Sequence, residues 1–128
     1  MLINFDESYS VGNALIDTHH KELVAILNSL FMAMRDRVGK AKTQLILHQL
    51  IDYTKYHFSA EEKLFEPSSY PKTLEHKKLH RDFIRKCEDW EYELQIGKPI
   101  NVDMLDFLTN WLINHIKQVD KEMSSYLR

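Results

Sequence analysis

Four long segments with helical periodicity limit what this chain can fold into. Apolar residues recur in each segment at steps of three and four, which is typical of helices that bury one face. Of the three glycines and three prolines, all except Gly12 fall between these segments, where they mark breaks. The segments span residues 17–38, 41–65, 73–96 and 101–126.

Long helices joined by short connections are typical of an up-down-up-down bundle. We therefore predict an all-α protein, an up-down-up-down four-helix bundle with an extended N-terminal arm. The length of 128 residues suits one domain. We expect residues 1–128 to form that single domain, with the arm over residues 1–16 and the bundle over residues 17–128. Gly39 suits a helix C-cap, and Asp17, Thr73 and Asn101 suit N-caps.

Composition excludes several classes of protein. The 17 basic and 19 acidic residues leave a net charge of -2, so no basic surface predicts nucleic-acid binding. No apolar stretch reaches the roughly 18 residues of a membrane span. Cys87 is the only cysteine, which excludes an internal disulfide and suits a reducing compartment. Because the first residues do not follow the pattern of a signal peptide, we expect a cytoplasmic location.

His57 and Glu61 stand four residues apart in the second segment, so they share one face of a helix. That face is otherwise apolar, with Leu47, Leu50 and Leu64 on it. A carboxylate on a core-facing stripe is costly unless it is paired or binds a metal. Taken alone, the pair also fits a surface pair or a capped carboxylate.

The other segments also carry histidine on their apolar stripes. One buried histidine is usually a hydrogen-bonded core residue, but five with two carboxylates would not be tolerated in an empty core. Metal ligation resolves this, because neutral imidazole and carboxylate are both ligands. The candidate ligands are His20, His57, Glu61, His76, His80, His115 and Asp120.

The number of candidate ligands indicates two metal ions. Seven side chains exceed the four ligands of a zinc ion and suit two six-coordinate ions, for which mixed imidazole and carboxylate ligation favours iron. We expect Glu61 and Asp120 to bridge the two ions. On an ideal helix Asp120 lies about 140° around the axis from His115. We therefore expect the aspartate to reach the site from a neighbouring face.

The motifs formed by these residues resemble those of the hemerythrin family, in its bacterial branch, over nearly the whole chain. They are D-x-x-H at Asp17–His20, H-F-x-x-E-E at His57–Glu62, H-x-x-x-H at His76–His80 and W-L-x-x-H-x-x-x-x-D at Trp111–Asp120. The resemblance implies a four-helix bundle whose non-haem di-iron centre binds dioxygen reversibly. It also implies two irons joined by an oxo or hydroxo bridge as well as by the two carboxylates.

The resemblance also divides the ligands between the two irons. It assigns His76, His80 and His115 to one iron, and His20 and His57 to the other. Counting the three bridges gives the first iron six ligands and the second iron five. We therefore expect dioxygen, or a small anion such as azide, at the second iron. An apolar pocket for it is expected from Leu23, Trp111, Leu112 and Ile116.

Other residues near the motifs are expected to have structural or surface positions and no ligand role. His19 points about 100° away from His20 on a helix, so we expect it to be exposed. Glu62 lies one residue off the stripe and should be solvated. His48 should lie on the surface, and Cys87 in the core. The fourth helix should continue regularly to about Tyr126, with Val119 on its buried face.

The function that we predict is reversible dioxygen binding for oxygen transport, storage or sensing, without enzymatic turnover. One alternative is a di-iron enzyme or scavenger that acts on oxygen, peroxide or nitric oxide. Another is a regulatory module that senses oxygen or iron, although the sequence identifies no protein partner. Ferritin-like di-iron proteins use about four carboxylates and E-x-x-H motifs. Two carboxylates and five imidazoles favour reversible binding over oxidation.

Overall fold

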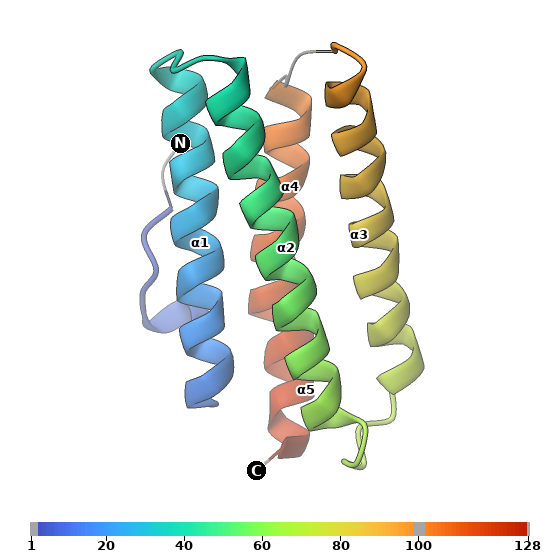
Figure 1. Ribbon diagram of the computed structural model, residues 1–128. Helices are drawn as coiled ribbons and strands as arrows, with labels where there is room; N and C mark the ends of the chain where they lie inside the picture. The colour runs from blue at the N-terminus through green and yellow to red at the C-terminus, as the bar shows by residue number, and fades with distance from the viewer. Residues whose placement is uncertain (1–2, 99–101, 128) are drawn as a thin grey trace.

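The structure is a computed structural model that describes residues 3–98 and 102–127. It is an up-down-up-down four-helix bundle, which confirms the predicted fold class (Figure 1). The fourth helix changes character along its length and ends in three short helical pieces, η2, α5 and η3. The predicted break at Pro99 and the predicted cap at Asn101 lie outside the described residues. The elements are η1 (Glu7–Tyr9), α1 (Ala14–Arg35), α2 (Lys40–Phe65), α3 (Thr73–Gln95), α4 (Val102–Asn114), η2 (His115–Asp120), α5 (Lys121–Ser124) and η3 (Ser125–Leu127).

The N-terminal arm is fastened to the bundle by Asp17. Helix α1 begins at Ala14 because the Asn13 side chain accepts a hydrogen bond from the backbone N–H of Ile16, at 3.1 Å. The expectation that Asp17 caps this helix was therefore wrong. Its carboxylate instead accepts hydrogen bonds from the Ser10 hydroxyl at 2.7 Å and the Val11 N–H at 2.8 Å. These two bonds hold the end of the arm against the first turn of α1.

Two predicted caps are also displaced. Gly39 is the N-cap of α2 rather than the C-cap of α1, whose C-cap is Asp36. Its φ of 109° is a conformation that residues with a Cβ rarely adopt. Lys72 is the N-cap of α3, and the Thr73 hydroxyl donates to the carbonyl of Tyr70 at 2.8 Å.

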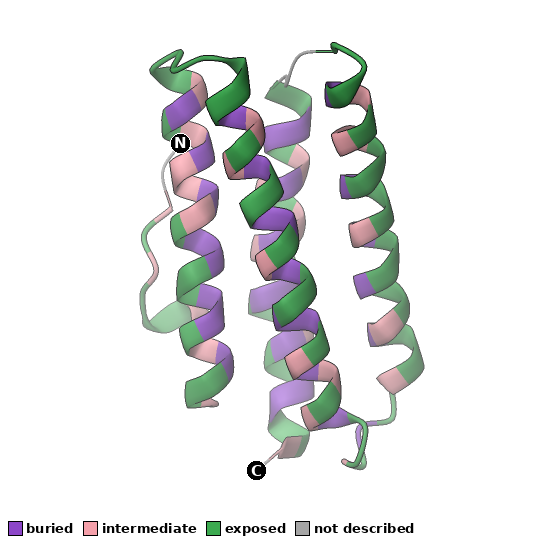
Figure 2. Ribbon diagram, in the orientation of Figure 1, coloured by how far each residue is buried: buried purple, intermediate pink, exposed green. Residues whose placement is uncertain are grey.

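The buried face of each helix points into the bundle, and two apolar clusters fill its interior (Figure 2). A large cluster of leucine, isoleucine and phenylalanine side chains includes Leu27, Leu50 and Leu108. A small cluster consists of Val11, Ile16, Phe65, Tyr70 and Met123. Residues of the predicted metal site lie on the helices between these two clusters. Cys87 belongs to the large cluster, as predicted.

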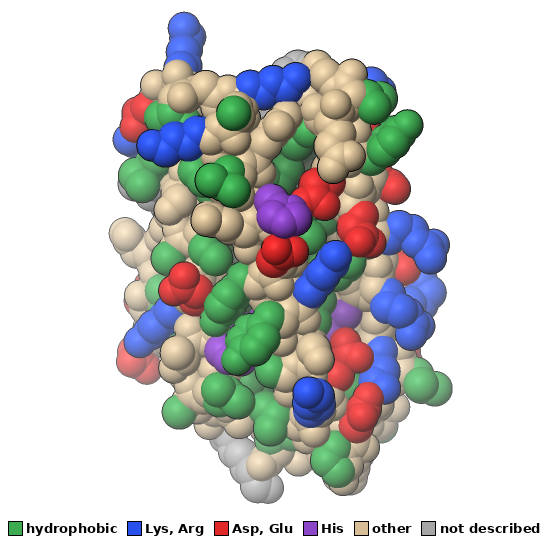
Figure 3. Space-filling view, viewed as in Figure 1, with side chains coloured by type: hydrophobic (Ala, Val, Ile, Leu, Met, Phe, Trp, Pro, Cys, Tyr) green, Lys and Arg blue, Asp and Glu red, His purple; other side chains and the backbone are tan. Residues whose placement is uncertain are grey.

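Basic and acidic side chains are interspersed over the face shown in Figure 3. Among the described residues, no helix combines the length and the apolar character that crossing a bilayer requires.

Segment η2 is a π-helix, and this was not predicted. A π-helical turn pairs residues five apart and holds more residues than an α-helical turn, so it brings His115 and Asp120 onto one face. Asp120 is consequently fully buried, whereas Val119 is only half-buried. The expectations of a regular helix to Tyr126 and of an aspartate reaching around from a neighbouring face were both wrong.

Candidate metal centre

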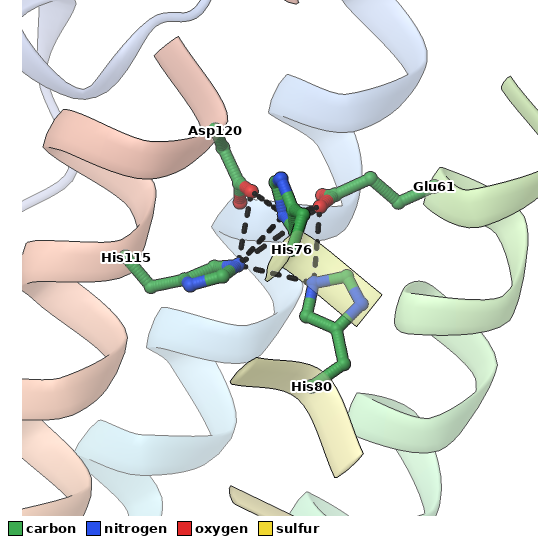
Figure 4. Close-up of side chains that lie close together, drawn as sticks. All are labelled: Glu61, His76, His80, His115 and Asp120. Carbon is green, nitrogen blue, oxygen red and sulfur yellow. Dashed lines mark hydrogen bonds and ion pairs between the residues drawn. The ribbon is translucent and has the colours of Figure 1, made fainter. Parts of the chain in front are cut away.

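The structure brings all seven predicted ligand side chains together in the bundle interior. None of them exposes more than 4% of its surface. They come from α1, α2, α3 and η2, so each of the four long helices of the bundle contributes. Five of them are drawn in Figure 4, where the side chains point toward a common centre. The donor atoms form two overlapping groups, which both contain Glu61 and Asp120.

Glu61 divides its two carboxylate oxygens between these groups. Oε2 lies 2.9 Å from Nε2 of His57 and 3.9 Å from Nε2 of His20. Oε1 lies 2.8 Å from Nε2 of His76 and 3.2 Å from Nε2 of His80. One oxygen therefore faces histidines of α1 and α2, and the other faces histidines of α3.

Asp120 is divided in the same way. Oδ2 lies 2.9 Å from Nε2 of His20, whereas Oδ1 lies 3.0 Å from Nε2 of both His76 and His115. We call His20 and His57 the two-histidine side of the centre. His76, His80 and His115 form the three-histidine side. Each carboxylate thus presents one oxygen to each side, as a bridging ligand does.

The hydrogen-bonding state of these atoms fits metal ligation. In the part of the chain that the structure describes, every buried side-chain nitrogen or oxygen without a hydrogen-bond partner belongs to this cluster. Buried polar atoms are normally paired. The atoms without a partner are both ring nitrogens of His20, Nε2 of His57, and all four carboxylate oxygens of Glu61 and Asp120.

The spacing of the three-histidine side gives a second test. Nε2 of His115 lies 3.2 Å from Nε2 of His76 and 3.1 Å from Nε2 of His80. Imidazole nitrogens bind metals at roughly 2.0–2.1 Å, so neighbouring ligands at right angles on one ion stand roughly 3 Å apart. The three nitrogens therefore have the separation expected of ligands to one shared ion.

The carboxylates of the centre are charged at neutral pH. Burial raises the pKa of Glu61, and so does the charge of Asp120. The neighbouring imidazoles of His57, His76 and His80 outweigh both effects and lower this pKa to about 2. Burial also raises the pKa of Asp120, but His115 and the other histidines bring it well below its usual value. Both groups are therefore ready to act as anionic ligands.

The histidines respond differently to the same surroundings. Burial lowers the pKa of His76, but the neighbouring Asp120 and Glu61 raise it to about 9. Burial lowers the pKa of His115, and there the two carboxylates do not compensate. Without a metal, His76 holds a proton at neutral pH that metal binding has to displace.

Three residues outside the cluster contact the Nδ1 atoms of three of these histidines. Nδ1 of His57 lies 3.0 Å from Nδ1 of His19, and Nδ1 of His80 lies 2.9 Å from Oε2 of Glu62. Nδ1 of His76 lies 3.3 Å from the hydroxyl of Tyr70. Ligating histidines commonly donate their second N–H to such partners.

Two expectations about these surrounding residues were wrong. His19 is buried rather than exposed, because the side of α1 that carries it packs against α2. Burial lowers its pKa, as do His57 and His20, so it is neutral at neutral pH. Glu62 is half-buried and paired with His80 rather than freely solvated. Tyr70 was not considered, because the loop between Pro67 and Pro71 has no periodicity from which to infer its direction.

The predicted pocket residues differ in how deeply they are buried. Leu23, Leu112 and Ile116 are fully buried. Trp111 is half-buried and stacks on His115, with ring centroids 4.5 Å apart and planes at 11°. Trp111 thus belongs to the three-histidine side. His48 is exposed, as expected, and lies 3.1 Å from Asp52.

Comparison with known proteins agrees with this architecture. Residues 11–127 match the family described as the hemerythrin HHE cation binding domain. The bacteriohemerythrin of Pseudomonas aeruginosa is 33% identical over 91% of this chain and 75% of its own length. The myohemerythrin of Sipunculus nudus is 34% identical over 91% of this chain and 86% of its own. A crystal structure of wild-type hemerythrin superposes with a TM-score of 0.91 at 26% identity, covering 99% of this chain and 98% of its own.

The helical bundle and its buried cluster of histidines and carboxylates define a metal-binding protein of the four-helix class. The chain belongs to the hemerythrin family.

Proposed function

We propose that this protein binds dioxygen reversibly at a non-haem di-iron centre. One iron is held by the three-histidine side and the other by the two-histidine side. Glu61 and Asp120 bridge them, together with an oxo or hydroxo group. The observation that carries the proposal is the division of each carboxylate, which directs one oxygen toward the three-histidine side and the other toward the two-histidine side.

The unequal number of imidazoles supports a role in ligand binding. With equal bridges, the two-histidine side has one protein ligand fewer, which is the open position that a reactive metal site needs. We therefore place dioxygen, or a small anion such as azide, on the side of His20 and His57. When bound, the two irons supply the electrons that dioxygen takes up on binding and returns on release.

The chain contributes a dry, neutral environment. Leu23 follows His20 by one helical turn, and Leu112 and Ile116 flank His115; all three are fully buried. We propose that these side chains exclude water from the dioxygen. Trp111 instead supports the ring of His115, on which it stacks. An apolar lining favours release of intact dioxygen over its reduction, because it provides neither water nor a proton donor.

The test begins with protein loaded anaerobically with ferrous iron. We expect two irons per chain, and a new absorption spectrum when oxygen is admitted. Degassing should restore the first spectrum and return the oxygen in stoichiometric amount. One metal per chain, or stoichiometric zinc after expression with ample iron, would contradict the di-iron centre. Continuous consumption of oxygen would instead indicate the alternative, a di-iron enzyme or scavenger.

A further inference from the structure

His19 is a buried histidine that is not among the seven candidate ligands. It exposes 6% of its surface, and its ring meets the ring of His57 edge-on, with centroids 5.1 Å apart and planes at 82°. The nitrogens that meet are the two Nδ1 atoms, 3.0 Å apart. Tyr53 and Tyr56 pack against the other parts of the His19 ring, with centroids 5.9 Å and 5.3 Å away.

The position of His57 fixes where its proton has to be. Nε2 of His57 faces Glu61, within the two-histidine side of the centre. This nitrogen must be unprotonated to bind a metal. A neutral imidazole carries one N–H, and in His57 it must then be on Nδ1. The only acceptor that the described residues offer to this N–H is Nδ1 of His19.

The same reasoning then fixes His19. Because its Nδ1 accepts the hydrogen bond from His57, that nitrogen is bare and its own proton is on Nε2. The opposite arrangement, in which His19 donates to His57, would put a proton on the metal-facing nitrogen of His57. His19 lies at the edge of the core beside Tyr56, which is 60% exposed, and its Nε2 is not among the buried atoms without a hydrogen-bond partner.

We propose that His19 is a positioning residue. It holds His57 in the Nδ1–H tautomer and directs Nε2 of His57 toward the metal position that His57 shares with His20. This inference rests on the proposed metal centre but not on dioxygen binding. The support is unlike that of His80, whose Nδ1 faces the carboxylate of Glu62 at 2.9 Å. A neutral imidazole is a weaker acceptor than a carboxylate, so His57 is a less basic ligand than His80.

One experiment observes the hydrogen bond directly. Protein labelled with ¹⁵N in histidine is loaded with Zn(II), which is diamagnetic, and examined by NMR. We expect the His57 proton on Nδ1, the His19 proton on Nε2, and a ¹⁵N–¹⁵N coupling between the two Nδ1 atoms. Absence of this coupling in the unmutated protein, or a His19 proton on Nδ1, would overturn the proposal.

A second experiment measures the consequence for metal binding, using Fe(II) titrations under anaerobic conditions. His19→Phe keeps an aromatic ring but removes the acceptor, and we expect it to weaken binding of the second iron by about 10-fold to 100-fold. His19→Asn keeps an acceptor oxygen near the position of Nδ1 and should restore most of that affinity. Binding of the first iron, on the three-histidine side, should be unchanged in both variants.

Glu62→Gln is the matched control, because it changes the partner of His80 and should weaken the other iron. Equal losses in His19→Asn and His19→Phe would mean that His19 acts only through packing, and would overturn the proposal. Should His19→Phe fail to fold, His19→Gln takes its place in the titration. The ¹⁵N–¹⁵N coupling is then measured in the unmutated protein, and its absence overturns the proposal. A protein that binds two irons as described but no dioxygen would contradict the proposed function and leave this inference standing.

Discussion

The two sides of the metal centre share both carboxylates but differ in what surrounds them. On the three-histidine side, each imidazole has a polar or aromatic support. On the two-histidine side, Nδ1 of His57 contacts the imidazole of His19, and Nδ1 of His20 has no hydrogen-bond partner. The supports of the three-histidine side are Glu62, Tyr70 and Trp111.

This difference teaches that the bundle orients its ligands unequally. Partners that accept an N–H fix the ring and raise its basicity, and a carboxylate does so more strongly than an imidazole. We therefore interpret the three-histidine side as the more tightly held part of the centre. The two-histidine side, with fewer and weaker supports, is better suited to gain and lose an external ligand.

The largest expected effect removes the feature that the two sides share. Glu61→Ala or Asp120→Ala should abolish binding of both irons, because each carboxylate faces both sides. Metal analysis after anaerobic loading measures this directly. His48→Ala is the control, since exposed His48 is not one of the seven candidate ligands, and it should retain iron. Two irons in Glu61→Ala would show that the carboxylate does not bridge.

Removing a ligand from one side should separate the two sides. In His20→Ala we expect the stoichiometry to fall from two irons to one, because the three-histidine side keeps all its imidazoles. His80→Ala should be more damaging, since it weakens the better-supported side. Iron analysis combined with circular dichroism distinguishes metal loss from unfolding. Loss of both irons in a folded His20→Ala protein would mean that the sides do not bind independently.

A polar side chain in the proposed pocket should act on the chemistry and not on the iron content. Leu112→Asn introduces a hydrogen-bonding group beside the centre, so we expect faster autoxidation, by about tenfold, as water and protons gain access. The decay of the oxygenated spectrum measures the rate. Trp111→Phe, which keeps a ring to stack on His115, should leave it nearly unchanged. An unaltered rate in Leu112→Asn with full iron would exclude Leu112 from the pocket.

The smallest effect concerns a histidine outside the comparison. A hydrogen bond to Glu91 and the charges of Asp52 and Glu91 raise the pKa of exposed His48 above 6.5. Stabilisation from this raised pKa is fully present below pH 6.5 and is lost as the pH rises through the folded-state value. His48→Ala should therefore lower Tm slightly at pH 6 and not at pH 9, with both irons retained. An equal loss at both pH values would indicate a packing effect instead.

Periodicity in the sequence was enough to predict the bundle and the burial of the seven donors. Six of the seven donors fall on an apolar stripe where an unpaired polar group would be costly, and the structure buries all seven. Their roles as ligands stay predictions. His19 was misjudged because its angle from His20 says only that it leaves the centre of the stripe. Whether α2 covers that angle depends on how the two helices pack, which periodicity does not specify.

The π-helical turn escaped prediction for a different reason. Residues 115–120 place Ile116 and Val119 at steps that a regular helix also accommodates. The only sign of an irregularity is that Asp120, which the site requires, lies one residue beyond the stripe. A regular helix in which Asp120 reaches around satisfies the same observation, and the sequence does not distinguish the two geometries.

The π-helical turn η2 holds one residue more than an α-helical turn, and this affects every residue that follows it. A π-turn in an otherwise α-helical segment is equivalent to one inserted residue, and every side chain after it is rotated by about 100° relative to an uninterrupted helix. Deleting exposed Gln118 would remove the insertion and leave a continuous helix of good propensity. The aspartate would then stand four residues after His115, about 40° around the axis of a regular helix, and would still face Glu61. The π-turn therefore absorbs one extra residue in the sequence while keeping the second carboxylate aligned with the centre.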